Sequence, residues 1–513
     1  MMKDSKTKNS VRNLFTGVVL KIYQILLPFV LRTMLIRILG MEYAGLNSLF
    51  TSILSMLNIA ELGVGTALVI SMYKPIEEND QAKICALMKI YRLYYRIIGL
   101  VILIIGGVLT PFLPYLISGE VPADVNLYIL YALNLGATVL SYWLFAYRNS
   151  LFTAHQRLDV VNVITLVTDT IKYGLQIVLL MTTKNYYAYL AVALFSQVLT
   201  NIITAIASRI YYPNYSPKGD LSVEEKKVLN KSIKDLAYSQ FGYIITLSFD
   251  SIVISAFLGL VPLAIYNNYY YILNALMAFF TIFSHSLSAS VGTNMLVKDS
   301  ASNFKDFKYI TFVVFGLLTF CCSCLATMYQ PFIELWVGKE NLLDIWCVIL
   351  FAIYLVVYEM VFLMELYKSS TGKWHSDRFR PFITAIINLT LNLTLVNFIG
   401  IYGILLSTIV SFAFFNLPWL IHRTFIDAFP KEYEKNYLSY LGLKILSLVG
   451  IVTISFFACY YLPIINLWAK LFINFGISAF LSIILYFIVS FKDSGVRRTF
   501  QLVRSFLRKD TAK

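Results

Sequence analysis

Residues 96–117 read RIIGLVILIIGGVLTPFLPYLI, with a single charged residue at the first position. A helix needs about 20 consecutive apolar residues to cross the ~30 Å hydrocarbon core of a bilayer, and this run has that length. The Pro-Phe-Leu-Pro motif at 111–114 marks its end, where proline does least damage to a helix. The stretch therefore predicts a transmembrane helix.

The rest of the chain repeats this pattern. Of the 513 residues, 58% are hydrophobic and 14% are charged, and the mean hydropathy is +0.71. A soluble protein has about a quarter charged residues, and a transmembrane barrel has short segments of alternating polarity. We predict an all-α polytopic membrane protein with about fourteen transmembrane helices. The expected spans are 14–36, 45–72, 96–117, 125–147, 160–182, 186–208, 236–258, 263–295, 309–333, 342–367, 382–400, 402–421, 438–461 and 464–490.

The positions of the basic residues predict the topology. With the N-terminus in the cytoplasm, cytoplasmic segments hold 34 of the 42 Lys and Arg residues, outer loops hold four, and four lie inside spans. Lys and Arg collect in cytoplasmic loops of membrane proteins, so both termini are expected there and the number of spans is even. The net charge of +14 then needs no nucleic-acid partner. Residues 1–13 show no cleavage pattern, so the first helix is expected to act as its own insertion signal.

A weak internal repeat predicts the domain organisation. Leu39-Gly40 and Leu258-Gly259 are 219 residues apart, and at that offset Asp169 falls on Asn388. Six spans return a chain to its starting side, so the two halves share one orientation and are related by a pseudo-twofold axis along the membrane normal, as in some transporters. The expected division is a bundle of helices 1–6 at 1–212, a cytoplasmic linker at 213–234, a bundle of helices 7–12 at 235–426, helices 13 and 14 at 427–491, and a basic tail at 492–513.

Three stretches carry a family resemblance: RILGMEYAGL at 37–46, LNIAELGVGTA at 57–67 and MYKPIEEND at 72–80, with DSIVI at 250–254 in the second half. Together they resemble the Wzx-type flippases of O-antigen, capsule and exopolysaccharide, in the polysaccharide transporter branch of the multidrug/oligosaccharidyl-lipid/polysaccharide (MOP) superfamily. The resemblance implies a bacterial cytoplasmic (inner) membrane protein with a V-shaped central cavity and alternating access. Its implied substrate is an undecaprenyl-diphosphate-linked oligosaccharide, and its implied partners are membrane lipid, a polysaccharide polymerase and glycosyltransferases.

The first predicted span carries the candidate diphosphate contacts. Lys21 and Arg32 are eleven residues apart, close to three helical turns, so both can project from one face, and Arg37 sits one turn beyond. A cation-lined, water-filled cavity would replace the hydration that a diphosphate loses in hydrocarbon. The alternative is that Arg32 and Arg37 reach the outer head groups along their aliphatic stems and only Lys21 is buried.

Ionisable residues in other spans are the remaining candidates, because such residues usually face a cavity or a partner. Asp169 and Lys172 stand at i, i+3, so a structural pair is favoured, although a free Lys172 would extend the basic surface. Glu61, Asp250 and Asp169 are candidate ion-coupling sites or counter-ions. For Glu61 and Asp250 the alternative is a structural salt bridge or a helix-cap contact. A proton or a sodium ion is the expected coupling ion.

Other functions fit less well. A flippase of lipid II type and a drug/cation antiporter of the MATE type remain open, although Lys21 and Arg32 disfavour a cationic substrate. A membrane glycosyltransferase or polymerase would need a large outer loop, and the outer loops are short. We therefore expect no enzyme. The chain has no Gly-x-x-x-x-Gly-Lys-Ser/Thr phosphate loop, its six cysteines are scattered, and no His or Cys pair has metal spacing, so no cofactor or metal is expected.

Overall fold

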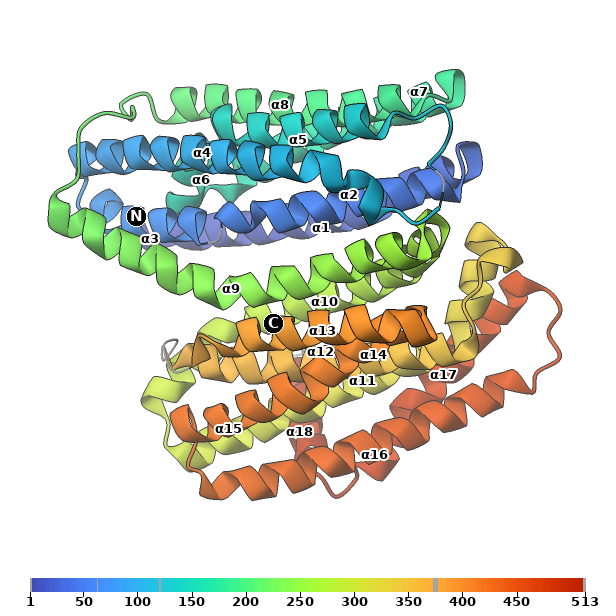
Figure 1. The fold of residues 1–513 in the computed structure, drawn as a ribbon. Coiled ribbons are helices and arrows are strands. Elements are labelled where there is room, and N and C mark those ends of the chain that lie inside the picture. Colours follow the sequence, from blue (N-terminus) through green and yellow to red (C-terminus); the bar gives the residue numbers. More distant parts are fainter. Residues whose placement is uncertain (1, 62, 120, 372–376, 511–513) are drawn as a thin grey trace. The chain divides into compact units, whose positions relative to one another are not determined.

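The computed structural model describes residues 2–61, 63–119, 121–371 and 377–510 (Figure 1). Every regular element in these ranges is a helix, which confirms the predicted all-α fold class. In chain order the helices are α1 Met2–Ile38, α2 Met41–Leu57, η1 Asn58–Glu61, α3 Val64–Glu77, α4 Gln81–Leu109, η2 Thr110–Leu116, α5 Leu127–Trp143, η3 Ala146–Arg148, α6 Asn149–Ala154, α7 Leu158–Thr183, α8 Tyr186–Tyr211, α9 Val223–Leu258, α10 Leu260–Val297, α11 Ser300–Val337, η4 Lys339–Asn341, α12 Ile345–Ser370, α13 Arg380–Ile399, α14 Ile401–Val410, the π-helix η6 Ser411–Asn416, α15 Leu417–Asp427, α16 Glu432–Tyr460, α17 Leu467–Val489 and α18 Ser494–Asp510.

Eleven helices among the described residues are long and apolar enough to cross a membrane, or twelve if α5 and α6, bent by 45°, form one span. The chain is therefore a multi-pass membrane protein. Two of the predicted spans fall short of this test. Residues 45–72 are divided between α2 and α3, and 236–258 belong to α9, where the apolar stretch Ile244–Leu258 is short. The count of fourteen spans stays a prediction.

The chain divides into two compact units. The first comprises residues 1–267 and 381–401, and the second comprises residues 268–380 and 402–513. The domain limits expected from the repeat, including the linker at 213–234, stay predictions.

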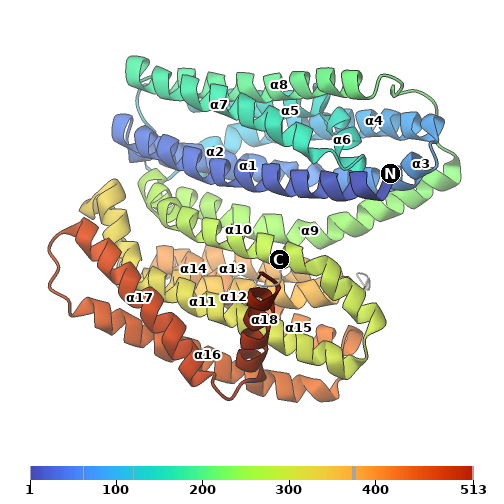
Figure 2. The same cartoon turned by 180° about the vertical axis from the view of Figure 1, so that it is seen from behind.

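In the first unit α1 lies along α7 and α7 along α8, while α4 packs on α5 and α2 on α9 (Figure 1, Figure 2). Side-chain caps begin several of these helices: Asn126 and Asn185 accept backbone N–H groups at the starts of α5 and α8. Ser222 and Glu225 form a capping box at the start of α9. Lys83 of α4 lies 2.6 Å from Glu225, and its hydrogen bond lowers the pKa of that carboxyl to about 2.

The segment 45–72 is broken because a short 3₁₀ helix, η1, separates α2 from α3. Gly63 follows η1 with a φ of 78°, in the left-handed region that favours glycine. A Cβ at this position would lie 2.7 Å from Leu236 Cβ and 2.9 Å from the carbonyl oxygen of Ile233, both on α9. The break and the close approach of α9 therefore depend on the same glycine.

Replacing Gly63 by alanine is expected to destabilise the protein by about 1–3 kcal/mol, because the side chain strains both the backbone and the α9 contact. The measurement is the thermal unfolding midpoint in detergent micelles. Gly107→Ala in α4 is the control, since a Cβ there meets nothing within 4 Å, and it is expected to leave the midpoint unchanged or raise it. Equal midpoints for the two variants would contradict this account.

A second break separates α5 from α6. Phe145 has a φ of 61°, and its N–H donates to the carbonyl of Trp143, two residues back, at 3.3 Å. η3 and α6 then leave at an angle to α5. The predicted span 125–147 is thus a helix that ends at Trp143.

In the second unit α11 is the central helix and packs against α12, α16 and α17 (Figure 2). Two polar side chains of α17 form hydrogen bonds to the backbone of α11. Tyr486 donates to the carbonyl of Phe312 at 2.6 Å, and Asn474 donates to the carbonyl of Thr327 at 2.8 Å. All four residues are buried, so these bonds fix the register of α17 on α11.

A buried ion network joins the end of α12 to the start of α13. Asp377 Oδ2 lies 2.6 Å from Lys368 Nζ and 2.7 Å from Arg380 Nε. Arg380 also reaches Glu365 at 2.7 Å and donates to the side-chain oxygen of Asn416 in η6. Lys368, Asp377 and Arg380 are each at most 7% exposed. The buried carboxylate of Asp377 is thus paired with two buried cations, because a buried charge needs a partner.

Candidate functional site

A cavity of about 560 Å³ lies inside the first unit. Its wall comes from α1, the α5–α6 break, α7 and α8, and most of its residues are polar or charged. The polar and charged residues of the wall are Lys21, Gln24, Asn149, Thr165, Asp169, Lys172, Tyr173, Ser196, Gln197, Thr200, Asn201 and Thr204.

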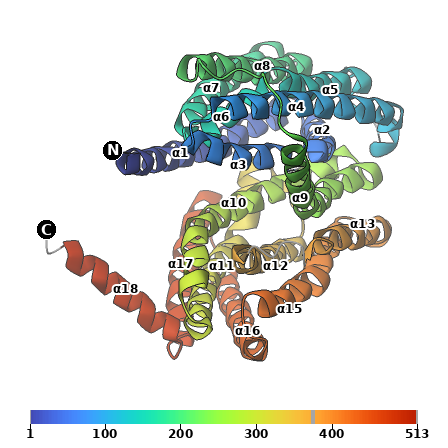
Figure 3. The same ribbon diagram turned by 90° about the vertical axis from the view of Figure 1, so that its left-hand side faces the viewer.

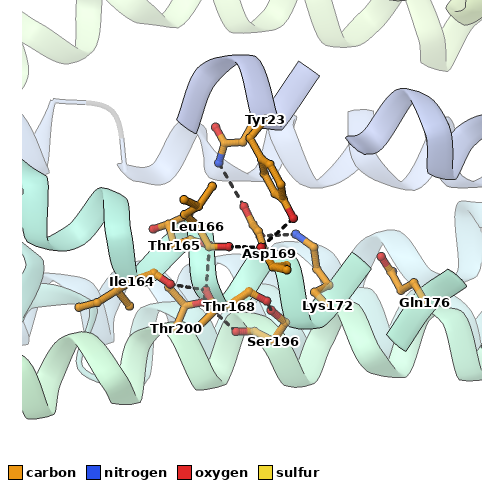
Figure 4. Close-up of polar contacts among 12 residues, drawn as sticks. Tyr23, Ile164, Thr165, Leu166, Thr168, Asp169, Lys172, Gln176, Ser196 and Thr200 are labelled. Carbon is orange, nitrogen blue, oxygen red and sulfur yellow. Dashed lines mark hydrogen bonds and ion pairs between the residues drawn. The ribbon is translucent and has the colours of Figure 1, made fainter. Parts of the chain in front are cut away.

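Asp169 and Lys172 of α7 form the pair that their spacing predicts (Figure 4). Lys172 Nζ lies 2.5 Å from Asp169 Oδ1 and 4.1 Å from the centre of the Tyr173 ring. Gln24 of α1 donates to the other oxygen of Asp169 at 3.3 Å. Both members of the pair also line the cavity, so the structural pair and the cavity position occur together.

Hydroxyl groups on α7 and α8 fix the wall behind this pair. Thr200 of α8 donates to the hydroxyl of Thr168 at 2.7 Å, and Ser196 donates to the carbonyl of Thr168 at 3.2 Å (Figure 4). On the α1 side, Tyr23 donates to Thr170 at 2.8 Å. Three helices are therefore held together by uncharged hydrogen bonds around the Asp169–Lys172 pair.

Lys21 is a cation of the cavity that is not neutralised. Its side chain is exposed and lines the cavity, and among the described residues it has no hydrogen-bond or ion-pair partner. An unpaired ammonium at membrane depth is expensive unless it faces water or an anionic ligand. The cavity provides the space for either.

Arg32 and Arg37 lie away from this cavity. Arg32 is half-buried and donates to the hydroxyl of Ser48 at 3.3 Å and to the carbonyl of Ala264 at 3.1 Å. Arg37 is exposed in the last turn of α1. Of the three cations of the predicted stripe, the structure brings Lys21 together with Lys172 and Asp169, and leaves the two arginines further along α1.

Glu61 ends η1 and is held by tyrosines. Tyr95 of α4 donates to one carboxylate oxygen at 2.5 Å, and Tyr142 of α5 donates to the other at 3.2 Å. Tyr91 bonds to Tyr95 at 3.0 Å, and Gly65 leaves room for this cluster, since a Cβ there would lie 2.9 Å from the Tyr91 hydroxyl. Hydrogen bonds to Glu61 thus connect the break between α2 and α3 to α4 and α5.

Asp250 of α9 is 3% exposed and faces amides of α13. Asn392 donates to its carboxylate at 2.6 Å and also lies 3.3 Å from the side-chain oxygen of Asn388. The contact is an inter-helix hydrogen bond inside the first unit. Whether Glu61 or Asp250 takes part in ion coupling stays a prediction.

Breaking the Asp169–Lys172 pair tests how much the pair contributes to the stability of the protein. Lys172→Met leaves a largely buried carboxylate without its cation and is expected to destabilise the protein by about 1–3 kcal/mol. Adding Asp169→Asn removes the stranded charge and is expected to restore most of the loss. Thermal unfolding of the single and double variants measures the difference. Lys74→Met, which breaks the exposed pair with Glu78, is the control and should have no effect. A Lys172→Met protein as stable as the wild type would rule out a structural role.

A family model described as "Polysaccharide biosynthesis protein" matches residues 10–291. The chain belongs to this family. The matched segment holds every residue that lines the cavity, and Glu61 and Asp250 as well.

Solved structures show that this member of the polysaccharide biosynthesis family has a transporter fold. The lipid II flippase MurJ, in its inward closed conformation, matches with a TM-score of 0.61 at 14% identity, over 95% of this chain and 99% of that one. An inward-facing multidrug resistance MATE family transporter of the MOP superfamily matches with a TM-score of 0.59 at 12% identity, over 83% and 98%. A MOP superfamily transporter from Pyrococcus furiosus Vc1 matches with a TM-score of 0.53 at 11% identity, over 84% and 97%. No curated protein matches the chain at a significant level.

The uncharged half of the cavity wall in this family member was not predicted. Ser196, Gln197, Thr200, Asn201 and Thr204 recur at helical spacing on α8 and form one polar face. That periodicity is visible in the sequence and is typical of a helix face that lines a polar cavity. Among the described residues, no group of three or more His, Cys, Asp or Glu side chains could hold a metal ion.

Proposed function

We propose that this protein flips an undecaprenyl-diphosphate-linked oligosaccharide from the cytoplasmic to the outer leaflet of the bacterial inner membrane, by alternating access, for surface polysaccharide synthesis. The observation that carries the proposal is the cavity with Lys21, which has no partner among the described residues, in a chain of the polysaccharide biosynthesis family. A volume of about 560 Å³ falls in the range of about 300–1,000 Å³ typical of ligand sites.

The chemistry of the wall suits a diphosphate and a sugar. A phosphate leaving water loses strong hydrogen bonds, and an ammonium at membrane depth replaces part of that hydration. Lys21 supplies this charge, while Gln197 and Asn149 supply donors and acceptors that sugar hydroxyls can use. Tyr173 also lines the cavity, with its ring against the Lys172 ammonium.

Lys172 is the second cation in this proposal, and Asp169 controls it. While Asp169 is ionised, it holds Lys172 at 2.5 Å and the pair is neutral. A proton or sodium ion on Asp169 would release Lys172 toward the substrate, which is one way to couple transport to an ion gradient. Flux measured under imposed pH and sodium gradients tests this step, because a rate independent of both ions rules it out.

Deletion of the gene tests the function. The deletion strain is expected to accumulate a lipid-linked oligosaccharide that an impermeant lectin or periodate cannot reach in spheroplasts, and mass spectrometry of extracted lipids would identify the sugar unit. The wild-type gene should restore access. Normal access in the deletion strain would refute the proposal.

The same strain separates the alternatives. A lipid II flippase predicts accumulation of lipid II and lysis, whereas a MATE-type antiporter predicts unchanged lipids and raised sensitivity to cationic drugs. Either outcome would replace the proposed substrate.

A further inference from the structure

The last helix, α18, combines cations with an apolar face. Its sequence is SGVRRTFQLVRSFLRKD, with five Arg or Lys residues and one Asp. Val496, Phe500, Val503 and Leu507 recur at intervals of four, three and four, which places them on one side of a helix. Arginines 497, 504 and 508 fall on the adjoining side. Such a pattern of high amphipathicity and low overall hydrophobicity is typical of helices that lie in a membrane interface.

The start of α18 is at the end of a transmembrane span. α17, one of the eleven spanning helices, ends at Val489, and α18 begins at Ser494 after a short turn. α18 runs across the direction of its neighbours α11, α16 and α17 (Figure 2). Figure 3 looks along several of these helices and shows α18 nearly at full length. A helix that crosses the span direction at the end of a span has the orientation of a helix lying along the membrane surface.

The first turn of α18 is anchored to the second unit. Arg498 lies 2.7 Å from Asp306 of α11, and its guanidinium lies 4.4 Å from the centre of the Tyr309 ring. Val496 is buried, and Gly495 approaches the Phe312 ring so closely that a Cβ would lie 2.5 Å from it. The direction in which α18 leaves the span is therefore set by packing.

The turn that precedes α18 is fixed as well. Lys444 of α16 is buried and lies 2.8 Å from Asp493. The other oxygen of Asp493 accepts the backbone N–H of Gly495 at 2.9 Å. Beyond the first turn the apolar side emerges, and Phe500 is 64% exposed next to Phe487 of α17.

We propose that α18 lies in the membrane–water interface and binds the head groups of anionic phospholipids. The apolar side, with Phe500 continuing the exposed apolar surface of α17, enters the acyl boundary, while the cations of α18 outside the Arg498 anchor, Arg497 and Arg504 among them, meet lipid phosphates. Charge complementarity and continuity with the span both identify the lipid surface as the partner. A nucleic acid would use the cations but not the apolar side.

Hydrogen exchange of the full-length protein in nanodiscs tests this proposal. Nanodiscs of phosphatidylcholine are compared with nanodiscs containing one-third phosphatidylglycerol, and exchange is followed for the amides of residues 500–510. Exchange is expected to be at least ~10-fold slower with phosphatidylglycerol, since each cation near an anionic surface contributes about five-fold to binding. Salt at about 1 M should remove the difference, because it shortens the screening length to about 3 Å.

The test variant is Arg504→Gln/Arg508→Gln/Lys509→Gln, which keeps the Arg498 anchor. It should lose the lipid-dependent protection. The control is Lys431→Gln/Lys435→Gln, which changes cations outside α18 and should keep it. Equal exchange in the two lipids, equal loss in the control, or slow exchange that persists in the test variant would each overturn the proposal. Unchanged protection of α11 shows that the variants are folded.

Discussion

Lys21→Glu is expected to abolish flipping, and Lys21→Gln to reduce it by about 10–150-fold, the range for a lost charge-assisted hydrogen bond of about 1.5–3 kcal/mol. The reason is that Lys21 lines the cavity and has no partner in the described part of the chain, so its charge is available to a ligand. Lys21→Glu adds repulsion between the new carboxylate and a phosphate. Lys21→Arg keeps the charge and should keep most of the activity.

The measurement is the rate at which lipid-linked oligosaccharide becomes accessible in proteoliposomes, together with complementation of the deletion strain. Arg37→Gln is the matched control, because Arg37 is on the same helix, is exposed and does not line the cavity. It should transport nearly as well as the wild type. A Lys21→Glu protein that is folded and active would exclude this cavity from transport, whereas equal losses in both variants would indicate a role of α1 as a whole.

Arg380→Met is expected to lower the stability of the second unit by about 3–5 kcal/mol, the usual effect of removing one partner from a buried ion network. Arg380 is 5% exposed and contacts Asp377, Glu365 and Asn416. Its loss removes a guanidinium from Asp377, Glu365 and Asn416, and it leaves the buried Asp377 carboxylate with one cation fewer. The thermal unfolding midpoint in micelles and the yield of folded protein measure the effect.

Arg378→Met is the control for this prediction. Arg378 lies two residues before Arg380 and is exposed, with its guanidinium 4.7 Å from the centre of the Phe379 ring. Its replacement removes the same charge from the same segment and should change stability by less than about 1 kcal/mol. Similar losses in the two variants would show that net charge, and not the buried network, stabilises this region.

The all-α membrane fold can be predicted from the sequence because the length and hydropathy of each apolar run indicate a helix, whatever the rest of the chain does. The sequence does not predict the breaks. Residues 45–72 and 125–147 have the hydropathy of single spans, but the left-handed residues Gly63 and Phe145 end helices inside them. For Gly63 a glycine was a visible signal, whereas nothing in the identity of Phe145 indicates a positive φ.

Only some residues of this cavity wall stand out in the sequence, for a similar reason. Lys21, Asp169 and Lys172 are conspicuous because charges are rare in spans, but the hydroxyl and amide residues of α8 disappear in an averaged hydropathy. Arg32 and Lys21 share a helix face, yet which cation meets the cavity depends on where α7 and α8 pack against α1. Lys368 and Arg380 lie between predicted spans and were therefore counted as loop charges. Both are buried because the tertiary structure places Asp377 and Glu365 next to them.

The bend between α5 and α6 changes how the cavity wall is interpreted. In an unbroken helix the carbonyl of Ser141 would accept the N–H of Phe145, but that N–H donates to Trp143 instead. The orphaned carbonyl receives the side-chain amide of Asn201 from α8 at 2.8 Å. Broken backbone at membrane depth is tolerated only where something else satisfies it. Asn201 is therefore already engaged as a substitute for a missing backbone amide, so part of the polarity that makes this space look like a substrate site maintains the bent helix.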